Sequence, residues 1–306
     1  MIIDSHIHLW DKIDGLLGNK KVKPVKDGMI QIGSKTCQGM PAWFTDCRNP
    51  AELVLAVFDE VGVDGGVVNQ GCLDGNQNDY LLKVKKKYPK RFFVYAWVDF
   101  TKPSELKKEF SAVVKRGFKG VIYPLMPTTQ NPIKLDSPAL MAIWEEMAGR
   151  GMILAMELFP GKVQTPEMRR VLEHFPDLKV TIGHFGFANH KNWMDQIRLA
   201  EFKNVYIECG GIIWLFRHEN SSFKKAQAKL KQAVKAIGAK KMMWGSDYPR
   251  TMVDFTYRQS LEFVTNGCEF LTEKEKADFL GGNAARLYGF KRRAHKYEPR
   301  TLITEL

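Results

Sequence analysis

The feature that most constrains the fold is a regular alternation of short β-type runs with helical stretches along the chain. Eight runs are rich in β-branched and aromatic residues, and the segments between them place apolar residues at helical spacing. Strands that alternate with helices predict a parallel sheet, and eight such units predict closure into a (β/α)8 TIM barrel. The eight runs are residues 2–10, 63–70, 91–100, 118–126, 152–160, 179–186, 204–211 and 241–249.

Residues typical of helix boundaries support the same division. Pro50 and Pro138 lie at expected helix starts, and Gly62 and Gly238 follow expected helix ends. A doubly wound open sheet is the alternative, but such a sheet normally carries a glycine-rich phosphate turn after its first strand. Histidines occupy that place here, so the barrel is favoured.

We expect a single domain over residues 1–306, because no linker divides the sequence. Residues 11–49, between the first strand and the first helix, are expected to form a long loop at the catalytic face of the barrel. Such a loop is either a lid or wall of the pocket, or an insertion that contacts a partner. Residues 291–306 are expected to form a charged C-terminal tail.

Composition argues against several classes of protein. No apolar run approaches the roughly 18 residues of a membrane span, and the chain enters its first strand without a cleavable leader. We therefore expect a protein that does not act at a membrane. The five cysteines are widely spaced, which argues against a disulfide framework, so we expect a cytoplasmic protein. The net charge of +12 is spread over several segments without a nucleic-acid-binding motif, so we expect no nucleic-acid partner. A positive field favours a small anionic substrate.

Polar residues gather where the expected strands end, and these ends face one mouth in a barrel. His6 and His8 lie two apart on the first strand and therefore point the same way. Glu157, His184 and Asp247 lie on the fifth, sixth and eighth strands. Imidazoles and carboxylates around one opening suit a divalent transition metal. The sequence therefore predicts one metal ion, with Zn²⁺ as the first candidate and Mn²⁺ as the second.

Four further residues near strand ends are candidates for binding the substrate. They are Tyr123, His190, Arg217 and Arg250, of which the cationic ones could hold a carboxylate through charge-assisted hydrogen bonds. Arg250 is the strongest candidate, because it follows Asp247 by three residues. Glu208 lies on the seventh strand, but the pleat leaves open whether its side chain faces the lumen.

Four segments carry a more specific signal through their order and spacing. They are residues 4–10 (DSHIHLW), 181–186 (TIGHFG), 243–249 (MWGSDYP) and 282–289 (GNAARLYG). Together they resemble the amidohydrolase superfamily, and more closely its amidohydrolase-2 branch, over nearly the whole chain. That branch contains lactonases, hydratases and metal-dependent decarboxylases of aromatic or unsaturated acids.

The resemblance implies roles for individual residues. His6 and His8 would bind the metal, and Asp247 would be a ligand, a general base, or both. His184 would polarise the substrate carbonyl or shuttle a proton. Decarboxylases of this branch usually place a metal-binding histidine on the fifth strand, but residues 152–160 contain none, and Glu157 is the candidate ligand in its place. Lactonases are looser at this position and some act without metal, so a metal-free mechanism stays open.

We therefore expect a hydrolase that opens a lactone-like ester or related carbonyl compound with metal-activated water. The alternative enzyme is a metal-dependent, non-oxidative decarboxylase of an aromatic or unsaturated carboxylic acid that uses the same site. A barrel that only binds or scaffolds is a third hypothesis. It has no physical need for the set of histidines and Asp247, so an enzyme is favoured. Dimers are common among proteins that resemble this one, which leaves a homodimer open.

Overall fold

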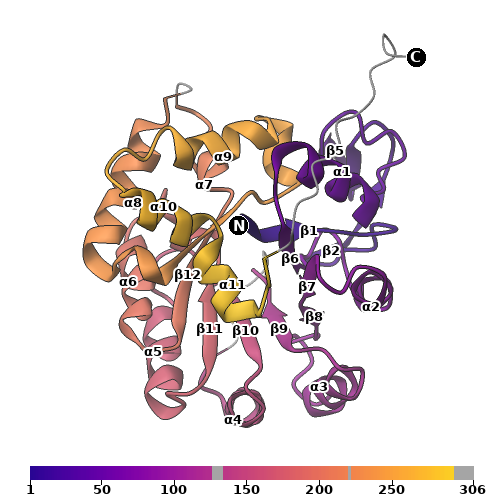
Figure 1. Ribbon diagram of the computed structural model, residues 1–306. Helices are drawn as coiled ribbons and strands as arrows, with labels where there is room; N and C mark the ends of the chain where they lie inside the picture. The colour runs from indigo at the N-terminus through magenta and orange to yellow at the C-terminus, as the bar shows by residue number, and fades with distance from the viewer. Residues whose placement is uncertain (126–133, 220–221, 293–306) are drawn as a thin grey trace.

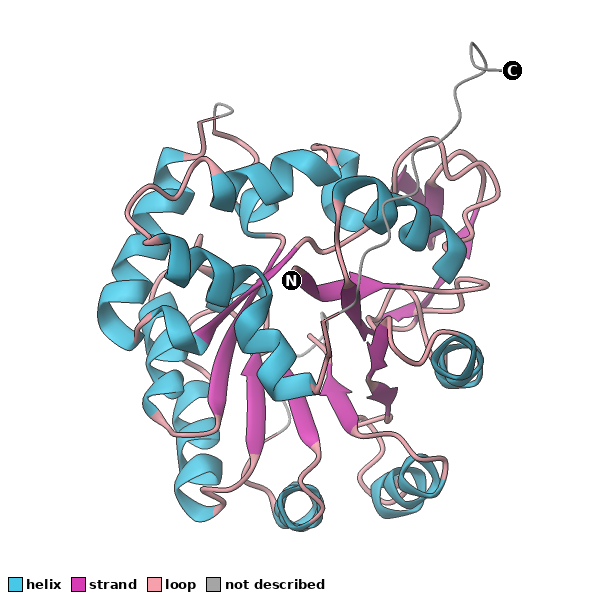
Figure 2. Cartoon of the chain, in the orientation of Figure 1, coloured by secondary structure: helices cyan, strands magenta, loops and turns pink. Residues whose placement is uncertain are grey.

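The predicted β-type runs form a ring of parallel strands in the computed structural model, which describes residues 1–125, 134–219 and 222–292 (Figures 1 and 2). The strands pair in two groups, in the order β1-β6-β7 and β8-β9-β10-β11-β12-β13. Their bounds are β1 Ile3–His8, β6 Gly65–Asn69, β7 Phe92–Val94, β8 Ala96–Trp97, β9 Gly120–Tyr123, β10 Ile153–Met156, β11 Lys179–Ile182, β12 Val205–Gly210 and β13 Met242–Gly245.

The two groups join into one ring. β7 and β8 are consecutive pieces of one predicted run, separated only by Tyr95, whose N–H donates to the carbonyl of Val68 at 3.0 Å. At the other seam, the N–H of Asp247 donates to the carbonyl of His6 at 2.9 Å. The N–H of His8 donates to the carbonyl of Tyr248 at 2.7 Å. β1 therefore lies beside β13, and the predicted (β/α)8 barrel is confirmed.

Helices surround the ring (Figure 2). The α-helices are α1 Ala51–Val61, α2 Asn78–Lys87, α3 Leu106–Lys115, α4 Pro138–Gly149, α5 Thr165–His174, α6 Trp193–Ile197, α7 Ile212–Leu215, α8 Lys224–Ile237, α9 Tyr257–Thr265, α10 Glu273–Ala277 and α11 Asn283–Tyr288. Short 3-10 turns include η1 His184–Phe187 and η4 Arg250–Val253. Within the described ranges, no helix is both long and apolar enough to cross a membrane.

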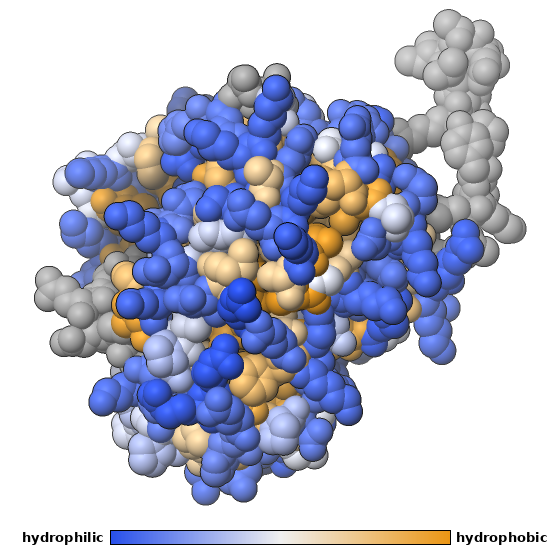
Figure 3. Space-filling model, turned by 90° about the vertical axis from the view of Figure 1, so that its left-hand side faces the viewer, coloured by the Kyte–Doolittle hydropathy of each residue, from blue (hydrophilic) through white to orange (hydrophobic). Residues whose placement is uncertain are grey.

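Local sequence explains the positions of the helices. α4 begins at Pro138, and proline is tolerated there because an N–H in the first turn would have no partner within the helix. One face of α4 is buried at helical spacing by Leu140, Ile143, Trp144 and Met147. The polar faces carry much of the positive charge. α8, for example, exposes Lys224, Lys225 and Lys231, and the side of the molecule at the left of Figure 1 is mainly hydrophilic (Figure 3).

Strand alternation separates an inner from an outer apolar layer. Val67, Ile122 and Ala155 belong to a small cluster inside the ring, whereas the larger core packs the outer faces of the strands against helices. α11 packs at the amino-terminal end of the ring, where the hydroxyl of Tyr288 lies 2.9 Å from that of Tyr95. This end is filled, so the carboxyl ends of the strands remain for a binding site.

Residues 11–49 contain a small antiparallel sheet in place of the expected irregular loop. Its strands are β2 Leu16–Leu17, β3 Lys20–Pro24, β4 Met29–Ile32 and β5 Lys35–Gln38, paired in chain order. Gly33, with a φ of 62°, opens the tight turn between β4 and β5. Val22 and Ile30 are buried beneath the sheet. The strands are too short to be recognised by periodicity, but they pair because the turns bring them together.

Asp4 on β1 joins the seam between β1 and β13. Its carboxylate accepts hydrogen bonds from the N–H of Ser246 at 2.9 Å and from the Ser246 hydroxyl at 2.5 Å. The hydroxyl of Tyr257 on α9 donates to the same carboxylate at 2.7 Å. All of these groups are buried, so each hydrogen bond is made away from water.

We predict that Tyr257→Phe lowers the free energy of unfolding by about 1.5–3 kcal/mol, because it removes one hydrogen bond to a buried carboxylate. Denaturant titration followed by tryptophan fluorescence measures the change. Tyr206→Phe is the control, since it removes the same hydroxyl from a half-buried residue of β12 that is not among the partners of Asp4. Equal stability of both variants would contradict a structural role for the Asp4 contacts.

Candidate metal centre

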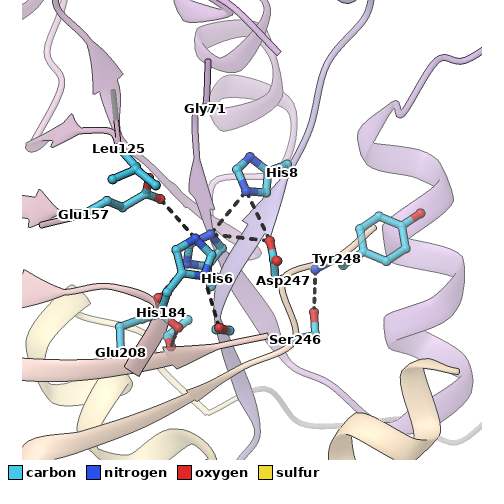
Figure 4. Close-up of polar contacts among 12 residues, drawn as sticks. His6, His8, Gly71, Leu125, Glu157, His184, Glu208, Ser246, Asp247 and Tyr248 are labelled. Atoms are coloured by element: carbon cyan, nitrogen blue, oxygen red, sulfur yellow. Dashed lines mark hydrogen bonds and ion pairs between the residues drawn. The ribbon is translucent and has the colours of Figure 1, made fainter. Parts of the chain in front are cut away.

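Five polar side chains meet at the carboxyl ends of the barrel strands (Figure 4). His6 and His8 come from β1, Glu157 follows β10, His184 follows β11, and Asp247 follows β13. They form two groups of potential metal ligands, one of His6, His8 and Asp247 and one of His6, Glu157 and His184. His6 belongs to both groups and is almost fully buried. The residues predicted as catalytic or metal-binding are therefore close together in the structure.

The donor atoms of the first group are spaced as the ligands of a tetrahedrally coordinated ion are. The Nε2 atoms of His6 and His8 lie 3.2 Å apart, and Asp247 Oδ1 lies 3.7 Å from the first and 3.4 Å from the second. Donors about 2.1 Å from a tetrahedral ion are separated by about 3.4 Å. Nitrogen and carboxylate donors of this kind suit Zn²⁺ or Mn²⁺. The residues present thus fit the expected metal.

A carboxylate orients each of the two histidines on β1. Glu208 Oε2 on β12 lies 2.5 Å from His6 Nδ1, and Asp74 Oδ2 lies 2.7 Å from His8 Nδ1. A carboxylate that accepts the Nδ1 proton leaves the lone pair of Nε2 free to bind a metal. The strand pleat left the direction of Glu208 open, and its side chain faces inward beneath His6.

Asp74 is a residue that the sequence reasoning missed. It lies in the turn after β6, and its Oδ2 also accepts the N–H of Gly71 at 3.0 Å. The signal that could have found it is its position, because it follows a barrel strand as Asp247 does.

Two glycines make room for the pair formed by His6 and Glu208. A Cβ atom on Gly210 would lie 2.7 Å from Glu208 Oε1 and from the His6 ring, and one on Gly245 would lie 2.5 Å from Glu208 Oε1. Any side chain at these positions would displace one member of the pair. The glycines at the ends of β12 and β13 are therefore required by close approach.

The second group contains a buried ion pair. His184 Nε2 lies 3.5 Å from Glu157 Oε1, and His184 Nδ1 lies 3.2 Å from the carbonyl of Gly210. Burial alone would lower the pKa of His184, but the hydrogen bond and charge of Glu157 raise it to about 10. Burial would raise the pKa of Glu157, but His184, the charge of His6 and the N–H of Leu125 lower it to about 2. At neutral pH His184 is therefore a cation and Glu157 an anion.

The same opposition of effects acts on His8 and Asp247. Burial would lower the pKa of His8, but the carboxylates of Asp74 and Asp247 raise it well above its usual value. Burial would raise the pKa of Asp247, but the hydrogen bond to His8 and the charges of the three histidines lower it. Asp247 is therefore ionised at neutral pH and can act as a ligand or a base.

These groups lie at the floor of a cavity of about 350 Å³, which is within the range of small-molecule sites. His8, Glu157, His184 and Asp247 face it. Much of its wall is apolar and comes in part from the sheet inserted after β1. The apolar wall includes Trp10, Ile30, Met40, Leu125, Phe187 and Trp214.

Of the four candidates for binding the substrate, Arg250 alone lines this cavity. Its Nη1 donates to the carbonyl of Gly39 at 2.8 Å. Tyr123 is buried on the outer face of β9 against Phe100, so it does not line the cavity. Arg217 is exposed and stacks on Trp214, and His190 lies in a separate surface hollow. The structure therefore gives no support to a substrate contact from the last three.

Comparison with known proteins agrees with this geometry. Residues 3–290 match the model of the family described as amidohydrolase. No curated protein matches the chain significantly.

Solved structures of low sequence identity share the fold. A probable 2-pyrone-4,6-dicarboxylic acid hydrolase from Acinetobacter baumannii with citric acid bound has a TM-score of 0.71 and 19% identity, over 94% of this chain and 99% of that chain. An amidohydrolase from Burkholderia multivorans with bound zinc has a TM-score of 0.69 and 16% identity, over 95% and 100%. The 5-carboxyvanillate decarboxylase of Sphingomonas paucimobilis has a TM-score of 0.56 and 18% identity, over 80% and 84%.

We predict that Glu208→Gln and Asp74→Asn each weaken Zn²⁺ binding by about 10–100-fold, because each variant loses the carboxylate that orients one histidine. Competition with a chromophoric chelator measures the affinity. Glu262→Gln, an exposed change on α9, is the control. Unchanged affinity in both variants would mean that these carboxylates do not support a metal site.

Proposed function

The chain belongs to the amidohydrolase family, whose model covers residues 3–290, and we propose that it is a metal-dependent hydrolase that opens a lactone-like ester or related carbonyl compound. The observation that carries the proposal is that two sets of residues, which share the buried His6, meet at one cavity. His6, His8 and Asp247 have the spacing of metal ligands, and His184 with Glu157 forms a charged pair beside them. Hydrolysis of a carbonyl compound needs both electrophilic activation and proton transfer.

His6, His8 and Asp247 would hold the ion, with Glu157 as a further candidate ligand through its group with His6 and His184. When bound, a divalent ion supplies Lewis acidity, which polarises a carbonyl group and lowers the pKa of water. The zinc bound in the Burkholderia multivorans structure supports Zn²⁺ as the first metal to test.

Asp247 is the residue placed to take a proton from water. Its pKa is lowered although it is buried, so its carboxylate is available as a base at neutral pH. It also lies at the cavity surface, where water and substrate can reach it. A base in this position needs no movement of the backbone before proton transfer.

His184 has the complementary role. The carbonyl of Gly210 accepts the Nδ1–H of His184, so the donor to the substrate is Nε2–H. Nε2 lies 3.5 Å from Glu157 Oε1, and its N–H would turn from that carboxylate to the carbonyl oxygen of the substrate while negative charge develops there. His184 can then pass this proton to the alkoxide that leaves when the ester bond breaks. Its backbone φ of 48° is unusual for a residue other than glycine, and it directs the ring toward His6 and Glu157.

One comparison favours a second candidate function, which is non-oxidative decarboxylation of an aromatic or unsaturated acid. The fold is shared with the 5-carboxyvanillate decarboxylase, although the identity is only 18%. In that reaction Asp247, which is ionised at neutral pH, would first take a proton from water or from the substrate and then deliver it to the carbon that loses its carboxyl group. Release of CO₂ separates the two reactions, because opening of a lactone produces none.

We predict that the purified protein holds about one equivalent of transition metal, and that His6→Ala/His8→Ala removes both the metal and the activity. Elemental mass spectrometry measures the metal, and a panel of lactones and of decarboxylatable acids measures the activity. Arg217→Ala, an exposed change outside the cavity, is the control. If the protein stays metal-free after attempted reconstitution with Zn²⁺ and Mn²⁺ and still turns over a lactone, this would favour direct action of Asp247 and the histidines on water.

We predict that Glu157→Gln moves the alkaline limb of the kcat/KM profile toward lower pH. Glu157 raises the pKa of His184 to about 10, so loss of this charge lets His184 lose its proton at lower pH. The measurement is kcat/KM for a hydrolysed lactone as a function of pH, with Glu262→Gln as control. An unchanged alkaline limb would exclude His184 as the acid.

A further inference from the structure

We propose that the substrate of this cavity has a hydrocarbon body and a single negative charge, and that the sheet inserted after β1 selects the hydrocarbon. The inference rests on the proposed function only in placing the reacting carbonyl at the floor of the cavity. It concerns the rest of the substrate, which must lie against the cavity wall. The proposed substrate carries one negative charge, unlike the dicarboxylate for which the Acinetobacter baumannii hydrolase is named.

The inserted sheet supplies an apolar wall. Ile13, Leu17, Ile30, Ile32 and Met40 all line the cavity. Ile13, Ile30 and Met40 are almost fully buried, whereas Leu17 and Ile32 are half-buried at the cavity surface. Side chains of this kind gain free energy when hydrocarbon replaces water on them, and they offer no hydrogen bond to a polar group.

The wall is held in place against the barrel. Asn49, at the end of the insertion, donates its side-chain N–H to the carbonyl of His8 at 2.6 Å. The indole N–H of Trp10 donates to the carbonyl of Cys47 at 2.8 Å. Arg250 donates to the carbonyl of Gly39, where a Cβ atom would lie 2.8 Å from Ile30. These contacts join the C-terminal end of the insertion, and Gly39 just after its last strand, to the barrel, so the apolar surface is preformed.

The charges around the cavity limit the charge of the substrate. Among the described lining residues, Arg250 is the only lysine or arginine. Its bond to Gly39 uses one of five N–H donors, which leaves others to bind a carboxylate. Asp74, Glu157 and Asp247 are negative and lie beside histidines.

The other cations at the floor are His184, which is paired with Glu157, and the ion, and the proposed function assigns both to the reacting carbonyl. A second carboxylate on the substrate would therefore lack a cationic partner. It would be placed against the isoleucines of the insertion or near the carboxylates of the centre, and both positions disfavour a negative charge. One carboxylate at Arg250 with hydrocarbon along the inserted sheet satisfies both the charge and the apolar surface.

The test compares nonanoate with nonanedioate, which have the same chain length but one and two charges. Isothermal titration calorimetry on the zinc-loaded protein, with saturating acetohydroxamate in both titrations to occupy the ion in place of the reacting carbonyl, measures both affinities. We expect nonanoate to bind at one site at least about tenfold more tightly than nonanedioate. Arg250→Gln should weaken nonanoate binding, because it removes the cation that faces the carboxylate.

A charge introduced on the wall gives the sharper result. Ile32→Lys places a second cation at the half-buried surface of the sheet, so we expect it to reverse the preference in favour of nonanedioate. Leu53→Lys, which adds the same charge to an exposed position on α1, is the matched control and should leave the preference unchanged. Equal affinity for the two acids, or the same shift in both lysine variants, would overturn the proposal.

These outcomes are separate from those that test the proposed function. A preference for nonanoate that depends on Ile32 supports the inference even if no lactone is hydrolysed. Hydrolysis of lactones by a protein that binds both acids equally would support the proposed function and overturn the inference.

Discussion

The seam between β1 and β13 is the contact on which the rest of the site depends. Asp4 and Ser246 are 242 residues apart in the sequence, yet they are hydrogen-bonded across this seam. Burial raises the pKa of Asp4 to about 6, although its hydrogen bonds to Ser246, Tyr257 and His6 lower it. A carboxyl group is tolerated there because the seam itself supplies its partners. If the strands separated, Asp4 would lose these partners, and His6 and His8 would lose their proximity to Asp247.

The arrangement beneath the histidines extends this constraint to the neighbouring strands. Glu208 reaches His6 from β12, and Asp74 reaches His8 from the turn after β6. The two histidines are therefore fixed from both sides of β1, by elements whose own positions are set by the ring. A site built on strands in this way keeps its geometry with little dependence on mobile loops. The loops and the inserted sheet are then free to differ in shape, and the cavity wall can change without altering the centre.

The sequence is sufficient to predict the ring and the proximity of His6, His8, Glu157, His184 and Asp247, because both depend on strong signals. Strand and helix periodicities alternate along the whole chain, and the end of each strand identifies residues that share the mouth. Tyr123 shows where this reasoning fails. Its strand is apolar on both faces, so no alternation of polar and apolar residues sets which side chains point inward. Ile122 occupies the interior, and Tyr123 packs outside.

Other features depend on tertiary contacts that a sequence pattern does not contain. The strands of the inserted sheet are two to five residues long, which is too short for a periodicity to be distinguished from chance. Asp74 becomes significant only when β6 is placed beside β1, because its partner His8 lies 66 residues earlier. Arg217 and His190 follow strands as Arg250 does, but their side chains turn to the outer surface. Position after a strand identifies the mouth, and the backbone then decides which side chains enter it.

The distance in sequence between the two halves of the centre also has a consequence for biosynthesis. His6 and His8 leave the ribosome first, and Asp247 follows about 12 to about 50 seconds later at ordinary elongation rates. During that interval the nascent chain presents two histidines without the carboxylate that completes their group. The group of His6, His8 and Asp247 can therefore form only when the last strand of the ring has been made and has closed against the first, so a metal that needs all three ligands would be bound late in synthesis or after it.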